Sequence, residues 1–186
     1  IKLWEYLFFK NTWIKYQEKN KEKFTSQMKL TIHGGFFSES SQSDEVKKDK
    51  QDSLKTIIKK SYEYLKDHNA LQTVIYAVKL LEDDPLFNAG IGSQIQRDGK
   101  IRLSASLMDS EMNKFSGVIN VEDIKNPILL AQNLRNEEDN VLSGEGAISY
   151  AKSKGFEYYS SETKERREDY IRNLKSSGMG TVGCVA

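Results

Sequence analysis

The chain has 186 residues, with 28 basic and 27 acidic side chains and a formal net charge of +1. This balance argues against a general nucleic-acid-binding protein, which carries a basic excess on one face. A single cysteine excludes an internal disulfide framework and a cysteine-based zinc site. Two histidines argue against a histidine-rich metal site, and no apolar run is long enough to span a membrane.

The first half of the chain predicts one strand and two helices. Residues 1–27 hold both tryptophans, and we expect an extension outside the domain, with a surface-seeking amphipathic helix as the alternative. Residues 29–33 alternate apolar and polar side chains and predict a strand that runs into Gly34-Gly35, where the backbone can take a positive φ. Helical spacing of apolar residues then predicts helices over 54–65 and 71–81, the second one capped by Asn69.

The second half begins with the connector 81–93, which is rich in Gly, Pro and Asn and unusually apolar for a solvated loop. Asp98-Gly99 between alternating residues predicts a hairpin, and 115–121 a third strand. Helices are expected from Asn126-Pro127, with Asn126 as the N-cap and Pro127 at the first helical position, and from Gly144. A charged helix is expected within 162–175, as a solvated face or linker, followed by a strand over 181–186. Mixed strands and consecutive helices favour an α/β fold of layered sheets with helices outside.

Thr181 is the first candidate for chemistry. It follows Gly180 at the start of an apolar strand, so its hydroxyl can face an open site at the end of a sheet. If the Gly180–Thr181 bond were cut, the new α-amine, with an ordinary pKa of about 7.7–8.0, could serve as the base for the hydroxyl of the same residue. Taken alone, a threonine at this position is more often only a good strand former.

Three further segments carry weaker signals. His33-Gly34-Gly35 suits a turn at the rim of a site, where backbone N–H groups could face an anion, although a structural role is commoner for such a histidine. Carbonyl oxygens of 81–93 could converge on a hard cation beside Glu82 and Asp84, or the segment could be a packed loop. Cys184 lies in an apolar strand and is expected to be packed rather than reactive.

Together these segments resemble the plant-type L-asparaginase and isoaspartyl peptidase family of N-terminal-nucleophile hydrolases. The resemblance covers about residues 28–186 and rests on the order and spacing of seven motifs: His33-Gly34-Gly35, residues 81–93, Arg97-Asp98-Gly99, residues 105–109, Lys125-Asn126-Pro127, residues 144–147 and Gly180-Thr181-Val182-Gly183. The chain departs from the family pattern at Phe36-Phe37, where Ala-Gly is common, and at Ser104 and Ser110.

The resemblance implies a four-layer αββα fold, made as a precursor that cuts itself before Thr181. It divides the chain into the extension 1–27, a first subunit of 28–180 and the start of a second subunit at 181–186. It therefore implies that the chain is the N-terminal part of a precursor and lacks most of the substrate site. The mature enzyme would hydrolyse L-asparagine and β-aspartyl dipeptides through a β-aspartyl ester on Thr181.

The resemblance also implies roles for single residues. Gly34 matches a glycine whose backbone conformation is tied to self-cleavage at Gly180 and Thr181, and Asn88 and His33 match positions near the nucleophile. A structural sodium ion, with no cofactor for the chemistry, would be held by main-chain carbonyls of Leu81, Glu82, Asp84, Phe87, Ala89 and Ile91. The complete protein would be a dimer of two-subunit units that binds small-molecule substrates, without nucleic-acid or membrane partners.

Two alternatives remain open. One is a relative that cuts other bonds, such as a glycosylasparaginase or a threonine endopeptidase of the same superfamily. The other is a truncated, inactive remnant that acts as a binding or structural protein. The single cysteine suits a reducing compartment, and we expect a cytoplasmic protein.

Overall fold

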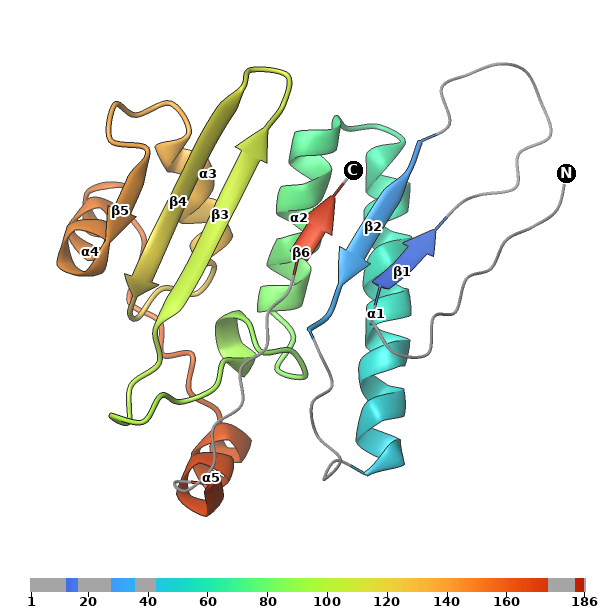
Figure 1. Ribbon diagram of the computed structural model, residues 1–186, viewed down its shortest axis with the longest axis vertical. Coiled ribbons are helices and arrows are strands. Elements are labelled where there is room, and N and C mark those ends of the chain that lie inside the picture. Colours follow the sequence, from blue (N-terminus) through green and yellow to red (C-terminus); the bar gives the residue numbers. More distant parts are fainter. Residues whose placement is uncertain (1–12, 17–27, 36–42, 174–182, 186) are drawn as a thin grey trace, which may run out of the picture. The chain divides into compact units, whose positions relative to one another are not determined.

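The computed structural model describes residues 13–16, 28–35, 43–173 and 183–185, the first four as backbone only. The chain divides into two units, one formed by residues 1–78 and 180–186 and the other by residues 79–179 (Figure 1). Helices and strands are mixed in both, which confirms the predicted α/β class. None of the helices in the described part of the chain is long and apolar enough to cross a lipid bilayer.

The first unit contains a three-stranded antiparallel sheet with the order β1-β2-β6. Its strands are β1 (Trp13–Tyr16), β2 (Leu30–His33) and β6 (Gly183–Val185). β2 is the central strand, and its alternating residues Leu30 and Ile32 are completely buried. The predicted first strand is therefore confirmed, and β1 places part of residues 1–27 in the same sheet.

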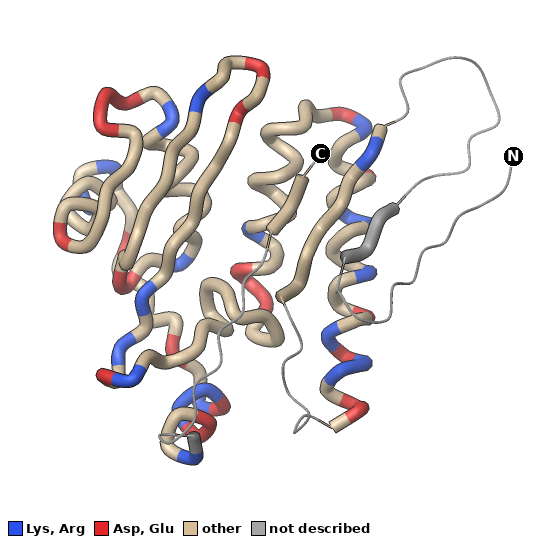
Figure 2. The backbone as a smooth tube through the Cα atoms, viewed as in Figure 1, with Lys and Arg blue, Asp and Glu red and all other residues tan. Residues whose placement is uncertain are grey.

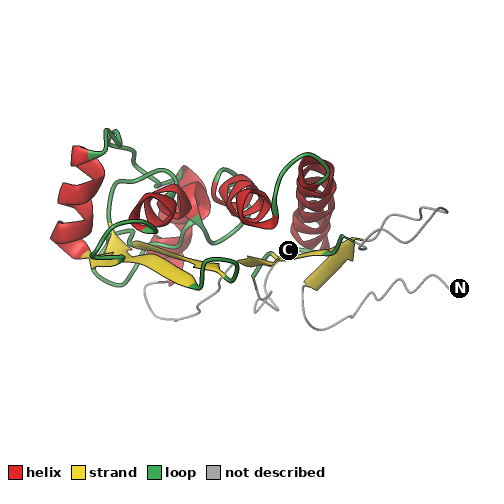
Figure 3. Cartoon of the chain, turned by 90° about the horizontal axis from the view of Figure 1, so that it is seen from above, coloured by secondary structure: helices red, strands yellow, loops and turns green. Residues whose placement is uncertain are grey.

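Two helices accompany this sheet. α1 (Asp44–Leu65) contacts β1 and β2 and covers one face of the sheet (Figure 3). Its predicted apolar face is buried: Leu54, Ile57, Ile58, Tyr62 and Leu65. Charged residues recur along the length of the helix (Figure 2), and most of them are exposed. α2 (Ala70–Glu82) begins at a reciprocal cap, in which Asn69 Oδ1 accepts from Gln72 N at 2.8 Å and Gln72 Oε1 accepts from Asn69 N at 3.2 Å.

The second unit contains a mixed sheet with the order β3-β4-β5. β3 (Leu103–Asp109) and β4 (Lys114–Val121) form an antiparallel hairpin, and β5 (Val141–Ser143) pairs parallel with β4 after the crossover helix α3 (Pro127–Leu134). α3 and α4 (Gly144–Ser153) lie on one face of this sheet (Figure 3). The apolar core between them contains Leu103, Val118, Val121, Ile124, Leu130, Leu134, Ala147 and Ala151. The single-turn helix η1 (Gly90–Gly92) and α5 (Lys164–Asn173) complete the unit.

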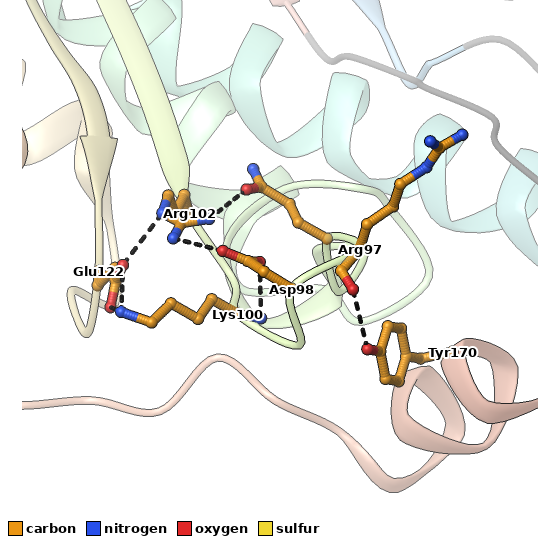
Figure 4. A network of polar contacts seen from close by, with 7 residues as sticks. Arg97, Asp98, Lys100, Arg102, Glu122 and Tyr170 are labelled. Atoms are coloured by element: carbon orange, nitrogen blue, oxygen red, sulfur yellow. Dashed lines mark hydrogen bonds and ion pairs between the residues drawn. The ribbon is translucent and has the colours of Figure 1, made fainter. Parts of the chain in front are cut away.

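The predicted hairpin at Asp98-Gly99 is wrong, because the residues on the two sides of the turn do not pair with each other as strands. A tight turn does form there, because Gln96 accepts from Gly99 N and donates to Lys100 O, and Gly99 has a φ of +84°. The residues on either side do not pair as strands, since β3 begins only at Leu103 and pairs with β4 instead. Side chains hold this turn: Arg102 binds both Asp98 and Glu122 (Figure 4).

The second face of the β3-β4-β5 sheet is apolar and exposed. The side chains on it include Met108, Phe115, Ile119 and Val141, which are 40–58% exposed. Met108 and Phe115 are direct cross-strand neighbours, and Val141 lies opposite Gly117 of β4, while Ser104 and Ser106 of β3 are exposed on the same face. An apolar sheet face of this kind normally packs against another layer of a protein.

Candidate functional site

The first candidate site is the end of β2, where the strand passes into Gly34-Gly35. β6 pairs antiparallel with β2, and Gly183 lies opposite His33 in the register. Because the two strands run in opposite directions, the chain enters β6 at the same end at which β2 continues into Gly34. Gly180 and Thr181 lie outside the described residues. The strand β6 begins two positions after Thr181, and its first residue, Gly183, pairs with His33, which precedes Gly34.

The backbone at this end has the conformation that the glycines permit. Gly34 and Gly35 are both buried, and Gly35 has a φ of +89°, in the left-handed region that residues with a Cβ rarely adopt. The predicted positive φ therefore falls on Gly35 rather than on Gly34. Burial lowers the pKa of His33, so its imidazole is mostly neutral at neutral pH.

The neighbouring thiol of Cys184 is not a competing nucleophile. It is partly buried in β6, and burial raises its pKa to about 12. A thiol with this pKa holds almost no thiolate at neutral pH. The partial burial of Cys184 agrees with the packing predicted for it, and its low reactivity stays a prediction.

A second, separate candidate site is the loop 81–93 of the other unit, which folds tightly around its own carbonyl oxygens. A Cβ built on Gly90 would lie 2.2 Å from the carbonyl oxygen of Glu82, and one on Gly92 would lie 2.1 Å from that of Phe87 and 2.6 Å from that of Pro85. Gly90 also has a φ of +49°. Glycine is thus required at both positions, because only glycine lets these carbonyls approach so closely.

The predicted carbonyl ligands are partly engaged within the loop. Asp84 O accepts from Phe87 N at 3.2 Å, and Ala89 O accepts from Gly92 N at 3.0 Å. Leu81 and Glu82 lie in the last turn of α2, where helix carbonyls have no partner within the helix and the helix dipole favours a cation. Among the described residues, no group of three or more His, Cys, Asp or Glu side chains could hold a metal. A cation in this loop would therefore be bound mainly by main-chain oxygens.

Glu82 also carries a buried carboxyl group, which the sequence did not single out as such. The residue is 2% exposed, its Oε1 accepts from Ile128 N at 3.1 Å, and its Oε2 has no hydrogen-bond partner in the described structure. Burial raises its pKa to about 8 against the opposing hydrogen bond from Ile128. Glu82 thus supplies the N-terminal cap of α3 from a different helix, while the predicted cap Asn126 donates to Asp83 Oδ1 at 3.1 Å.

Asn88 closes the same loop. Its Oδ1 accepts from Gln94 N at 2.8 Å, across η1. The structure therefore shows that Asn88 closes the loop. Its predicted position near the nucleophile stays a prediction, because Asn88 and residues 180–186 belong to different units. A residue that the sequence did not reveal is Arg166 of α5, whose Nε donates to Gly92 O at 2.7 Å. No local pattern signals a contact between residues so far apart in the chain.

The family model for asparaginase matches residues 26–183, which is most of the chain. The chain belongs to the asparaginase family. Its members include an isoaspartyl peptidase/L-asparaginase of Nostoc sp., 39% identical over 86% of this chain and 57% of the relative, and a protein of the same name from Synechocystis sp., 41% identical over 85% and 53%. The isoaspartyl peptidase of Escherichia coli is 32% identical over 84% of this chain and 56% of its own length.

The chain spans about half the length of these asparaginase-family relatives. The family match includes the end of β2, the loop 81–93 and Gly183 at the start of β6. The resemblance read from the sequence motifs is therefore confirmed at the level of the family.

Proposed function

We propose that this chain is part of an isoaspartyl peptidase/L-asparaginase precursor that cuts itself between Gly180 and Thr181. After the cut, Thr181 hydrolyses the side-chain amide of L-asparagine and the isopeptide bond of β-aspartyl dipeptides. The names of the relatives support the substrate class, because two isoaspartyl peptidase/L-asparaginases align with more than four-fifths of this chain.

One structural observation carries the proposal. β6 pairs with β2 so that Gly183 lies opposite His33, next to Gly34-Gly35. We therefore propose that Thr181, two residues before Gly183, acts at the end of the sheet that holds the buried pair Gly34-Gly35. Glycines at this end let another group approach the backbone closely. The raised pKa of Cys184 disfavours a thiolate at this end, which is compatible with a hydroxyl as the nucleophile.

The self-cleavage follows from the chemistry of the Gly180–Thr181 bond. The Thr181 hydroxyl attacks the Gly180 carbonyl, the acyl group moves from the nitrogen to the oxygen, and the amine of Thr181 is released. Water then hydrolyses the resulting ester, so that Gly180 ends in a carboxylate and Thr181 begins a new chain with both its hydroxyl and its α-amine. Gly180 has no side chain to hinder the attack.

The same hydroxyl then acts on the substrate. The α-amine of Thr181, with an ordinary pKa of about 7.7–8.0, takes the proton of the hydroxyl as it attacks the β-carbonyl of the substrate. Ammonia leaves from asparagine, or the α-amine of the second residue leaves from a β-aspartyl dipeptide. Water hydrolyses the β-aspartyl ester, which releases aspartate and restores the hydroxyl.

We further propose that the loop 81–93 holds a sodium ion through main-chain carbonyls, among them those of Glu82 and Phe87. The close approach of Glu82 O to Gly90 and of Phe87 O to Gly92 supports this assignment, because main-chain oxygens suit a hard cation. The ion would fix the shape of the loop and take no part in the reaction. Leu81, Asp84, Ala89 and Ile91 complete the proposed ligand set.

The four-layer αββα architecture is part of the same proposal. The exposed apolar face with Met108, Phe115, Ile119 and Val141 supports it, because a second sheet packed there would bury these side chains. We assign that sheet to the part of the full-length protein that lies beyond the described residues. Residues 28–180 then form the first subunit, residues 181–186 start the second, and two such pairs form the dimer. One cysteine suits a reducing compartment, so we place the protein in the cytoplasm.

The test is self-cleavage and hydrolysis by the full-length protein. Purified wild-type protein is expected to give two fragments on a denaturing gel, with a new N-terminus at Thr181, and to release ammonia from asparagine and free aspartate from a β-aspartyl dipeptide. Thr181→Ala should give one uncut band and no product. Thr56→Ala, which removes an exposed threonine hydroxyl from α1, is the matched control and should behave as the wild type. An uncut, inactive wild-type protein would overturn the proposal.

A further inference from the structure

The turn at Asp98-Gly99 places a carboxyl group beside a backbone nitrogen that carries little steric protection. The Asp98 side chain is 51% exposed, and the next residue is a glycine, which has no side chain to hinder an approach to its nitrogen. A bond between Gly99 N and the Asp98 carboxyl carbon would close an unstrained five-membered ring. The sequence pair thus has the composition in which a side chain condenses most readily with its own backbone.

In the folded protein, hydrogen bonds hold both of these groups. Gly99 N donates to Gln96 O at 2.9 Å. The Asp98 carboxylate accepts from Lys100 N at 3.3 Å through Oδ1 and from Arg102 Nη2 at 2.7 Å through Oδ2. The hydrogen bond from Arg102 also lowers the pKa of Asp98, so the carboxyl group stays ionised and has no hydroxyl that could leave as water.

Arg102 contributes most of the side-chain contacts of this turn, as Figure 4 shows. Its Nη1 donates to Gln96 Oε1 at 2.6 Å, its Nη2 to Asp98 Oδ2 at 2.7 Å, and its Nε lies 3.1 Å from Glu122 Oε1. One guanidinium group therefore joins both sides of the turn to the residue that follows β4. The Arg102 side chain is 23% exposed, which shields its contacts from water better than those of a fully exposed ion pair.

We propose that Asp98-Gly99 is a site of isoaspartate formation and that Arg102 slows this modification in the folded protein. When the turn opens and the carboxyl group is protonated, Gly99 N attacks the Asp98 carboxyl carbon. A new N–C bond forms, and the carboxyl hydroxyl leaves with the amide proton as one water. Water then adds to the cyclic imide: opening at the side-chain carbonyl restores aspartate, and opening at the main-chain carbonyl gives isoaspartate. The steps need no co-reactant other than water.

The isoaspartyl form could not keep the contacts of the native turn. Its main chain contains one additional carbon before Gly99, and its carboxylate is bonded to Cα instead of Cβ. The hydrogen bonds that Asp98 accepts from Lys100 and Arg102 would be lost, and with them a restraint on the residues that precede β3. The inference is independent of the proposed self-cleavage and hydrolysis, because it concerns only the turn and its contacts.

The test is the rate of isoaspartate formation in the full-length protein, incubated at neutral pH and elevated temperature. A lysine-specific protease releases residues 80–100 as one peptide. Its isoaspartyl form has the same mass but a different chromatographic retention, and fragmentation assigns the modification to residue 98. We expect the wild type to form isoaspartate more slowly when folded than when unfolded in urea. Asp98→Glu should form none at this position, because the corresponding ring has six members and closes far more slowly.

Two variants distinguish a specific effect of Arg102 from a general loosening of the turn. Arg102→Met keeps the apolar stem and removes the guanidinium, and we expect it to raise the rate in the folded protein about fivefold. Glu122→Gln is the control: it weakens a different contact of Arg102 and leaves the one with Asp98, so its rate should stay within about twofold of the wild type. In urea, all three proteins should react equally fast.

Three results would overturn the inference. The first is an unfolded wild type that forms no isoaspartate at residue 98 or forms it no faster than the folded protein. The second is an Arg102→Met variant that reacts at the wild-type rate when folded. The third is an equal acceleration in Arg102→Met and Glu122→Gln, which would show that any loosening of this network has the same effect.

Discussion

Replacing Gly92 by alanine tests whether the loop 81–93 is as closely packed as the structure indicates. The new Cβ would lie 2.1 Å from Phe87 O and 2.6 Å from Pro85 O, whereas ordinary van der Waals contact begins at 3.4 Å. Both neighbours are backbone atoms, so no flexible side chain can move aside. The backbone must open by more than 1 Å, and overpacking of this kind costs about 1–3 kcal/mol or more.

The melting temperature of the full-length protein measures this cost. For a protein of 150–250 residues, about 2 kcal/mol corresponds to a fall of roughly 4–8 °C, and the fall is smaller in a longer protein because the entropy of unfolding grows with length. The matched control is Gly146→Ala in α4, where a Cβ meets nothing within 4 Å. Alanine is the better helix former by about 1 kcal/mol, so this variant should melt slightly higher than the wild type.

A sodium titration gives the second measurement. If the loop binds sodium, the wild type should melt higher in sodium chloride than in choline chloride at equal ionic strength, because a ligand that binds only the folded state stabilises it. Gly92→Ala should lose most of this difference, and Gly146→Ala should keep it. If Gly92→Ala melts within about 1 °C of the wild type, the reasoning from close packing is refuted.

Three further predictions concern single contacts. Burial alone would raise the pKa of Asp109, but hydrogen bonds from Met112 N and from Arg135 at 2.5 Å lower it. Its stabilising contribution is therefore present above its ordinary pKa of 3.8 and is lost as the pH falls through the lower pKa of the folded state. Asp109→Asn should thus destabilise the protein more in urea unfolding at pH 7 than near pH 2, and equal effects at both pH values would contradict this. Cys184 should react with a thiol reagent at pH 8 far more slowly in the native than in the urea-unfolded protein, and equal rates would show that its thiol is accessible. Asn69→Ala removes the cap of α2 and should lower the unfolding free energy by about 1 kcal/mol, with a fall below about 0.3 kcal/mol as the result that excludes capping.

Local patterns in the sequence predicted most of the fold that depends on near neighbours. The spacing of Leu54, Ile57, Ile58, Tyr62 and Leu65 predicted one buried face of α1, and the structure buries it. The alternation from residue 29 predicted β2, and the pair Asn126-Pro127 gave the start of α3. Such patterns succeed because the hydrogen bonds and apolar contacts that they report lie within one or two turns of the chain.

Contacts between distant residues could not be predicted in this way. The turn at Asp98-Gly99 has the right residues for a hairpin, but the strand that follows it pairs with β4, so local turn chemistry did not decide the pairing. Glu82 at the end of α2 accepts a hydrogen bond from Ile128 N and so caps α3, and Arg166 donates to Gly92 O. In both contacts the two residues are far apart in sequence, so no local pattern predicts them. The resemblance identified the family and the loop, but not the contacts that hold the loop in shape.

If the chain cuts itself as proposed, the pairing of β6 with β2 has a consequence for the product. Before the cut, Gly183–Val185 and Leu30–His33 belong to one polypeptide, and their ladder is an intramolecular contact. After it, the same ladder joins two polypeptides, as a strand added to the edge of another chain's sheet does. The fragments should therefore co-purify under native conditions and separate only in denaturant. A second fragment that begins at Thr181 and is supplied in trans would be able to pair its β6 strand with β2 of the first fragment.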